Sequence, residues 1–328
     1  MNFCTKFDHH YLDRGLALYE SLQRWAPGSR LHVLALSHQC AHFLMALDLP
    51  HVRVLRTEDL CRIEPRLTAA KADRNAAAYV FTQTPFLVLA ALQDLSEGQH
   101  LVYIDADTCF FSSPANVVDT AREYDVCLTR HNFAAHSQPA ELYGEFNTGW
   151  VGFTRTPAAM RCAGWWAERC LEWCHDRPEG GKFADQKYLE AFPHMNVGVQ
   201  TLSSPGVNCA PWNVSGRCFR NRNGQIYVDE KKLVHFHFSL LQKVTPFCVA
   251  PRFSQQLVLK TRGLRRHVYS PYCRDLRAVA TRFRIPREFL HVRARSARDM
   301  HAGFHSRDAR PAWWRIAWRV AKGEYVIG

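Results

Sequence analysis

The chain contains 328 residues, of which 47% are hydrophobic, and it has a formal net charge of +12. A chain of this length can bury the core of one large domain or of two small ones. It has no run of 18 apolar residues, so we expect no membrane-spanning helix. Lys6 and Asp8 interrupt the start of the chain, which is not a signal-peptide pattern. The 12 cysteines then predict free thiols in a reducing, cytoplasmic compartment.

The excess of positive charge lies near the C-terminal end of the chain. Residues 260–328 carry 17 basic and 5 acidic side chains, whereas residues 1–259 carry 25 of each kind. Such asymmetry indicates a segment that meets an anionic surface, either a membrane or a nucleic acid. We therefore expect a main domain over residues 1–255 and a basic, mainly helical extension over residues 256–328.

Strands and helices alternate from the first residue of the chain. The apolar patterns predict strands over residues 2–5, 31–36, 51–55, 101–104, 124–128, 146–153 and 232–238. They predict helices over residues 11–25, 40–47, 69–91, 158–174 and 183–189, with Pro85 marking a start or a kink near Thr84. This alternation is typical of an α/β fold in which helices flank a mixed, mostly parallel sheet. Ligands bind such sheets beyond the carboxyl ends of the strands.

Two carboxylates follow the predicted strand over residues 101–104. Asp105 and Asp107 are separated by one small residue, so in an extended chain their side chains point the same way. Two like charges this close are unfavourable unless a cation lies between them. Oxygen ligands suit Mg²⁺ or Mn²⁺, so the pair is a candidate metal site. The alternative is an ordinary acidic turn.

Two further features carry side chains with possible chemistry. His235 and His237 lie at spacing two on the predicted strand over residues 232–238, and one or both could reach a metal held by the carboxylates. Asp185 opens the predicted helix over residues 183–189, where it is either a functional residue or a helix N-cap.

The order of these motifs over roughly residues 1–250 resembles the GT-A class of nucleotide-sugar glycosyltransferases, most closely glycosyltransferase family 8. The D-x-D motif of that family looks like Asp105-Ala106-Asp107, and its N-x-G looks like Asn147-Thr148-Gly149. Its D-Q pair looks like Asp185-Gln186, and its H-x-x-G-x-x-K-P looks like His237 with Lys243. Four motifs in this order are more specific than any one of them.

The sequence also departs from the family pattern. Leu240 stands where the family has glycine, and Val244 stands where it has proline. Residues 79–82 carry no basic group, although the family often has one in the corresponding region to contact the donor sugar. The identity of the sugar therefore does not follow from the resemblance.

The resemblance implies a catalytic domain that moves a sugar from a nucleotide-diphosphate donor, such as a UDP-sugar, to a glycan or lipid-linked acceptor with retention of configuration. The implied metal ligands are Asp105, Asp107 and His237, with His235 as a substitute, and mixed oxygen and imidazole ligation favours Mn²⁺ over Mg²⁺. The remaining implied roles are as follows: Thr5 and Lys6 face the base and ribose, Asn147 and Gly149 meet the donor, Lys243 contacts a phosphate, Asp185 binds sugar hydroxyls and Gln186 lies against the reacting face. An inverting enzyme would need a general base, which Asp185 could supply.

The last predicted helix, over residues 311–323, combines basic and aromatic residues. Arg315, Arg319 and Lys322 share one face, and three tryptophans and Ile316 supply apolar surface. This pattern suits an anionic membrane, so we expect a peripheral enzyme at the inner membrane face that uses a lipid-linked or lipopolysaccharide-type acceptor. The alternative is a helix that packs on the domain with solvated arginines.

Three other functions compete with sugar transfer. Ile104-Asp105-Ala106-Asp107-Thr108 also fits the first motif of haloacid-dehalogenase-type phosphatases, in which the first aspartate is a nucleophile, but a later G-D-x-x-x-D is missing. A nucleic-acid-binding protein would explain the basic tail, although the neutral remainder and the acidic pair argue against it. A non-catalytic sugar-binding protein is the third alternative.

Overall fold

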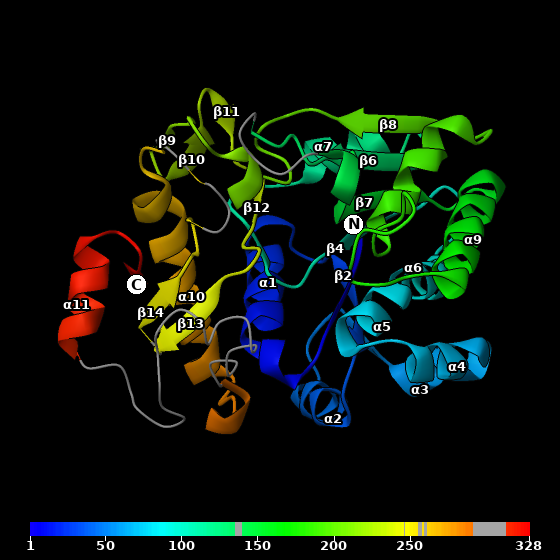
Figure 1. Cartoon of the computed structure of the whole chain (residues 1–328), viewed down its shortest axis with the longest axis horizontal. Coiled ribbons are helices and arrows are strands. Elements are labelled where there is room, and N and C mark those ends of the chain that lie inside the picture. The colour runs from blue at the N-terminus through cyan, green and yellow to red at the C-terminus, as the bar shows by residue number, and fades with distance from the viewer. Residues whose placement is uncertain (135–139, 246, 255–257, 259–260, 291–312) are drawn as a thin grey trace.

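The computed structural model describes residues 1–134, 140–245, 247–254, 258, 261–290 and 313–328 (Figure 1). A seven-stranded sheet with the order β3-β2-β1-β4-β7-β6-β8 forms its centre. These strands are β1 (Asn2–Phe7), β2 (Arg30–Ala35), β3 (Val52–Arg56), β4 (His100–Ile104), β6 (Val126–Arg130), β7 (Phe146–Thr154) and β8 (Val199–Leu202). Only β7 runs antiparallel to its neighbours in this sheet. The predicted α/β fold with a mixed, mostly parallel sheet is confirmed.

Helices cover both faces of this sheet. The helices are α1 (Leu12–Trp25), α2 (His38–Leu47), α3 (Thr57–Ile63), α4 (Arg66–Asp73), α5 (Ala76–Thr82), α6 (Thr84–Gln93), α7 (Ala115–Ala121), α8 (Ala140–Tyr143), α9 (Pro157–Glu172), α10 (Ser270–Arg282) and α11 (Trp313–Ala321). Alternate residues of a strand point to opposite faces, so Phe3 packs in the core on the side of α1 and α10, whereas Cys4 packs in the core on the side of α6 and α9.

The predicted single helix over residues 69–91 is wrong, because the structure has three separate helices there. It is divided among α4, α5 and α6, because the Asn75 side chain accepts a hydrogen bond from the backbone N–H of Ala78, 2.8 Å away, and starts a new helix there. The predicted start near Thr84 is confirmed, since Pro85 occupies the first turn of α6. The stretch Ala76–Gln93 is long and apolar enough to cross a membrane, with a mean hydropathy of 1.3, but 61% of it is buried inside the protein, as in the core helix of a soluble domain.

In the described part of the chain, three smaller sheets accompany the central sheet, and one of them joins the second half of the chain to the first. β5 (Thr108–Phe110) pairs with β12 (His235–His237), and β9 (Phe219–Arg222), β10 (Gln225–Val228) and β11 (Lys231–Lys232) form a sheet of their own. β13 (Gln242–Thr245), β14 (Cys248–Ala250) and β15 (Val326–Ile327) form another. The predicted strand over residues 232–238 is therefore two short strands. The predicted helix over residues 183–189 is instead a 3₁₀ segment, Gln186–His194.

The described part of the basic extension packs on the main domain. The ring of Tyr272 in α10 stacks on Phe238 with their centroids 3.6 Å apart, and Leu276 lies in the same core as Phe3. β15 pairs with β14, and Val326 is 4% exposed. The described residues of α10 and β15 therefore share a hydrophobic core with β1 and α1.

Candidate active site

The two carboxylates lie at the carboxyl end of β4, in the turn that joins it to β5. Ala106 is buried in the core, whereas the side chains of Asp105 and Asp107 are 27% and 17% exposed. Asp105 Oδ1 accepts a hydrogen bond of 2.8 Å from the Tyr103 hydroxyl. The carbonyl of Asp107 accepts one of 2.7 Å from the backbone N–H of Phe238. The turn is thus held both by β4 and by the distant end of β12.

His237 reaches both carboxylates from more than a hundred residues along the chain. In the antiparallel pair of β5 and β12, His237 lies opposite Thr108, directly after Asp107. Its Nε2 is 3.2 Å from Asp107 Oδ1 and 3.7 Å from Asp105 Oδ2. One ligand atom of each residue lies within 4.8 Å of the others, so all three can bind one ion.

His235 is not part of this group. It lies opposite Phe110 in the same pair of strands, and its ring stacks on Trp150 with centroids 5.0 Å apart. Its Nδ1 accepts a hydrogen bond of 3.3 Å from the backbone N–H of Asn208. Burial lowers its pKa to about 3, so the ring stays neutral. The structure makes His235 a core residue rather than the substitute ligand that the sequence predicted.

Neighbouring charges shift the pKa values of Asp107 and His237. Burial alone would raise the pKa of Asp107, but His237 and Arg14 lower it below the ordinary value. Burial alone would lower the pKa of His237, but Asp107 and Asp105 raise it above the ordinary value. Arg14, in α1, is 8% exposed, and its guanidinium donates to the carbonyl of Leu241, 3.0 Å away. Sequence reasoning missed Arg14, whose helical position carries no motif.

Asn147 and Gly149 lie directly beside His237. Asn147 Oδ1 accepts hydrogen bonds from the backbone N–H of Gly149 at 2.8 Å and from Asn208 Nδ2 at 3.1 Å. A Cβ on Gly149 would lie 2.5 Å from Asn147 Oδ1, 2.7 Å from His237 Nδ1 and 2.8 Å from Asn208 Oδ1. Only glycine fits here, because three polar atoms already fill the space that a side chain would need.

Asp185 joins the site through a buried chain of hydrogen bonds. Lys6 Nζ donates to Thr84 Oγ1, which in turn contacts Asp185 Oδ2. Lys6 Nζ also donates to the Tyr103 hydroxyl at 2.8 Å, and that hydroxyl donates to Asp105. Asp185 is 2% exposed, and burial raises its pKa to about 6 against the opposing charge of Lys6. Asp185 occupies the N-cap position of the 3₁₀ segment Gln186–His194, but its side chain makes no capping hydrogen bond there.

Gln186 and Thr5 are also buried at this end of the sheet. Gln186 Nε2 donates to the carbonyl of Tyr143 at 2.7 Å, and its Oε1 accepts from Asn147 Nδ2 at 3.4 Å. Thr5 is fully buried in β1, and its hydroxyl has no hydrogen-bond partner among the described residues. The structure therefore joins Gln186 directly to Asn147, and it places Thr5 next to Lys6 in the same strand.

Lys243 is paired with a buried carboxylate of α1. Its Nζ is 2.6 Å from Oδ2 of Asp13, which is 1% exposed in α1. Leu240, on the loop between β12 and β13, has a φ of +58°, in the left-handed region that favours glycine. The loop thus keeps a glycine-like backbone conformation at the position where the family has glycine.

No family model matches the chain. Two uncharacterized proteins of Bacillus subtilis (strain 168) are similar to it. YfnF is 28% identical over 245 residues, which is 72% of this chain and 80% of that protein. YfnD is 26% identical over 283 residues, which is 84% of this chain and 88% of that protein.

Three solved structures that resemble the chain are glycosyltransferases. The galactosyltransferase LgtC with donor and acceptor sugar analogs is 16% identical, with a TM-score of 0.43 over 64% of this chain and 76% of that one. An active-site mutant of LgtC is 13% identical, with a TM-score of 0.47 over 74% of this chain and 89% of that one. Mouse xyloside xylosyltransferase 1 is 14% identical, with a TM-score of 0.43 over 64% of this chain and 88% of that one. Because these scores lie below 0.5, the chemistry of the site has to be argued from its own residues.

Proposed function

We propose that this protein is a divalent-cation-dependent glycosyltransferase of the GT-A class, which moves a sugar from a nucleotide-diphosphate donor to a glycan or lipid-linked acceptor. The observation that carries the proposal is the meeting of Asp105, Asp107 and His237 at the carboxyl end of β4. Ligands bind α/β sheets at this edge. Asn147, Gly149, Asp185 and Gln186 lie around the same edge and would face the donor.

The ligand atoms of Asp105, Asp107 and His237 fit a divalent cation. Two carboxylate oxygens and the Nε2 of an imidazole lie within 4.8 Å of one another, and Mn²⁺ accepts both kinds of ligand. Cations of this kind, when bound, stabilise the negative charge that a diphosphate leaving group gains. The cluster also has the right sign, because two carboxylates face one imidazole.

The surrounding residues would hold the donor in place. Lys6 and Thr84 fix the Asp185 carboxylate, and Asn147 fixes the amide of Gln186, so neither side chain is free to turn away. Asp185 is 2% exposed and already bound to Thr84, which suits a residue that positions sugar hydroxyls better than a base that meets an acceptor. We therefore propose retention of configuration, which NMR of the product's anomeric proton would test.

A panel of nucleotide-sugars tests the proposed activity. We expect the correct donor, such as a UDP-sugar, to raise the melting temperature of the protein only when Mn²⁺ or Mg²⁺ is present. Asp107→Asn should remove this shift and lower transfer at least about a hundredfold, since it removes one anionic ligand. Asp119→Asn is the matched control, because Asp119 lies on α7 with its side chain 63% exposed.

Two results would contradict the proposal. One is a rise in melting temperature with the nucleotide-sugar that is equally large in EDTA, because the donor would then bind without a divalent cation. The other is full transfer by Asp107→Asn with normal folding. Hydrolysis of phosphate monoesters by the wild type, without transfer from any nucleotide-sugar, would favour the phosphatase alternative.

We also propose that the enzyme is cytoplasmic and binds the inner membrane face through α11. Trp318 is 52% exposed, and Lys322 Nζ is 3.9 Å from its ring centroid, so one aromatic and one basic group face outward together. Arg319 is 2.9 Å from Glu324, and Ile316 is 3% exposed, so part of α11 packs on the domain. The side chain of Arg315 lies outside the described residues.

Vesicle co-sedimentation tests this membrane contact. Trp318→Ala combined with Lys322→Gln should weaken binding to anionic vesicles about tenfold and leave transfer to a soluble acceptor unchanged. Substitution is a cleaner test than deletion of residues 311–328, because that deletion also removes β15 from β14. Equal vesicle binding by the variant and the wild type would rule out this role of α11.

A further inference from the structure

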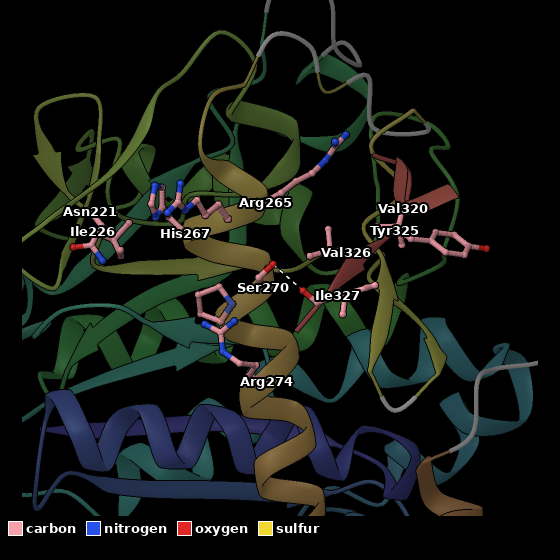
Figure 2. Close-up of a pocket in the computed structure, with 12 residues that line it drawn as sticks. Asn221, Ile226, Arg265, His267, Ser270, Arg274, Val320, Tyr325, Val326 and Ile327 are labelled. Carbon is pink, nitrogen blue, oxygen red and sulfur yellow. Dashed lines mark hydrogen bonds between the residues drawn. The ribbon is translucent and has the colours of Figure 1, made fainter. Parts of the chain in front are cut away.

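A cavity of about 980 Å³ lies at the start of α10 (Figure 2). Its walls come from the β9–β10 sheet, from the first turns of the helix that leads into α10, and from the C-terminal segment with β15. Asn221 and Ile226 lie on one side of this helix, and Val326 and Ile327 lie on the other (Figure 2). None of the residues assigned to the candidate active site lines this cavity.

The cavity is strongly basic. Arg265, Arg266, His267 and Arg274 line it, and no acidic residue does. Among the described residues, no carboxylate lies within ion-pair distance of the three arginines. Glu230 and Glu324, on neighbouring elements, are already paired with Arg222 and Arg319 at 2.8 and 2.9 Å. Within the described ranges, the positive charge of these arginines therefore has no ion-pair partner.

Part of this positive charge lies at the N-terminal end of a helix, where it is electrostatically unfavourable. A turn of π-helix, Arg265–Tyr269, runs directly into α10, so three basic residues occupy the first turn of one long helix. The N-terminal end of a helix carries partial positive charge and favours anions, so basic side chains there are unfavourable. Natural helices usually place acidic groups at this end instead.

The backbone fixes these residues in place. Gly263 precedes the helix with a φ of +74°, and a Cβ on it would lie 2.1 Å from the carbonyl oxygen of Phe219. The start of the helix is thus pressed against β9. On the other side, Ser270 Oγ donates a hydrogen bond of 2.9 Å to the carbonyl of Ile327 (Figure 2). The arginines therefore project from a backbone that is held from two directions.

We propose that this cavity binds a phosphate-bearing ligand, namely a phosphate ester or a diphosphate. Guanidinium groups match phosphate oxygens in geometry and charge, and the N-terminal end of the helix also favours an anion. The volume exceeds the needs of one phosphate group and leaves room for the rest of such a ligand. The ligand is either a soluble phosphate compound or the headgroup of an anionic lipid.

Calorimetric titration of the full-length protein with inorganic pyrophosphate in EDTA tests the proposal, because EDTA keeps divalent cations away from Asp105 and Asp107. We expect saturable binding, which Arg266→Gln combined with Arg274→Gln weakens at least tenfold. Arg161→Gln is the matched control, since it removes an exposed arginine of α9 far from the cavity. Asp107→Asn should also leave pyrophosphate binding unchanged, which separates this site from the proposed donor site.

Melting temperatures provide the second measurement. Pyrophosphate should raise the melting temperature of the wild type and of Arg161→Gln, but not that of the double variant. Without pyrophosphate, the double variant should melt no lower than the wild type, since Arg266→Gln removes an unfavourable charge from the first turn. This result would also show that the double variant is folded.

Vesicles distinguish the two sources of phosphate. Stronger binding to phosphatidylcholine vesicles with phosphatidic acid than to phosphatidylcholine alone would identify a lipid headgroup, provided that the double variant weakens this binding further in the background of Trp318→Ala and Lys322→Gln. Binding of pyrophosphate without such vesicle binding would identify a soluble ligand. The proposal is overturned if neither probe binds, or if the double variant binds both as tightly as the wild type.

Discussion

The carboxyl end of β4 and the cavity at the start of α10 differ in how their charged side chains are paired. At the carboxyl end of β4, each described charge has a neighbour of opposite sign: His237 faces Asp107, and Lys6 joins Asp105 to Asp185 through two hydroxyls. In the cavity at the start of α10, Arg265, Arg266 and Arg274 share one sign and no described acidic partner. The first region therefore holds carboxylates in contact with cationic or hydroxyl groups, whereas the second keeps a surplus of positive charge that favours an anionic ligand.

The largest effect should come from destroying the balance around Lys6. Lys6→Met leaves Asp185 buried without its cation, and loss of one partner of a buried charge network costs about 3–5 kcal/mol of unfolding free energy. The pKa of Asp185, already raised to about 6 by burial, should rise further. A raised pKa in the folded state stabilises the protein at low pH, and this stability is lost as the pH rises through that pKa. Urea unfolding should therefore show a larger penalty at pH 8 than at pH 5.

The background variant Asp185→Asn provides the control for this pH dependence. It keeps an oxygen acceptor for Thr84 but removes the titrating group, so the penalty of Lys6→Met should become nearly independent of pH. An equal pH dependence in both backgrounds would mean that another group controls it, and the proposed link between Lys6 and Asp185 would fail.

A smaller effect should come from filling the space beside His237. Gly149→Ala places a Cβ within 2.8 Å of three polar atoms, and overpacking of this kind costs about 1–3 kcal/mol. His237 would have to move, so transfer activity and Mn²⁺ affinity should each fall at least about tenfold. Isothermal titration with Mn²⁺ and a transfer assay would measure both.

Gly164→Ala is the matched control for Gly149→Ala. Apart from its chain neighbours and the backbone of its own helix, no atom lies within 4 Å of a Cβ at Gly164 in α9, so this change should stabilise the protein by about 0.5–1 kcal/mol through helix propensity. If Gly149→Ala binds Mn²⁺ as tightly as Gly164→Ala does, the close packing around His237 does not support metal binding.

Much of the central fold could be predicted because apolar patterns are local. The strands over residues 2–5, 31–36 and 101–104 lie within or one residue outside the observed β1, β2 and β4. The break between α4 and α5 was missed, because a single Asn75 interrupts an alanine-rich run that otherwise favours a helix. The short strand β15 depends on a partner far along the chain, which periodicity does not reveal.

The candidate site divides in the same way. Asp105, Asp107 and His237 were found because their types and spacing suggest ligation, and the structure brings them together. Lys6 was expected to face a nucleotide, yet its ammonium is committed to Thr84 and Tyr103, whose hydroxyls carry no sequence signal. Buried networks of this kind form only when distant elements pack, so they lie beyond the reach of motif spacing.

The smallest effect concerns the loop between β12 and β13. Leu240 is 57% exposed with a φ of +58°, and this conformation costs a residue with a side chain about 1–2 kcal/mol. Leu240→Gly should therefore stabilise the protein by about 0.5–1 kcal/mol in urea unfolding, because part of the gain is offset by the freedom of glycine in the unfolded chain. Leu142→Gly, at an exposed residue of the helix α8, should give no gain, since that backbone already suits leucine. Equal stability changes in the two variants would show that the left-handed turn at Leu240 stores no strain.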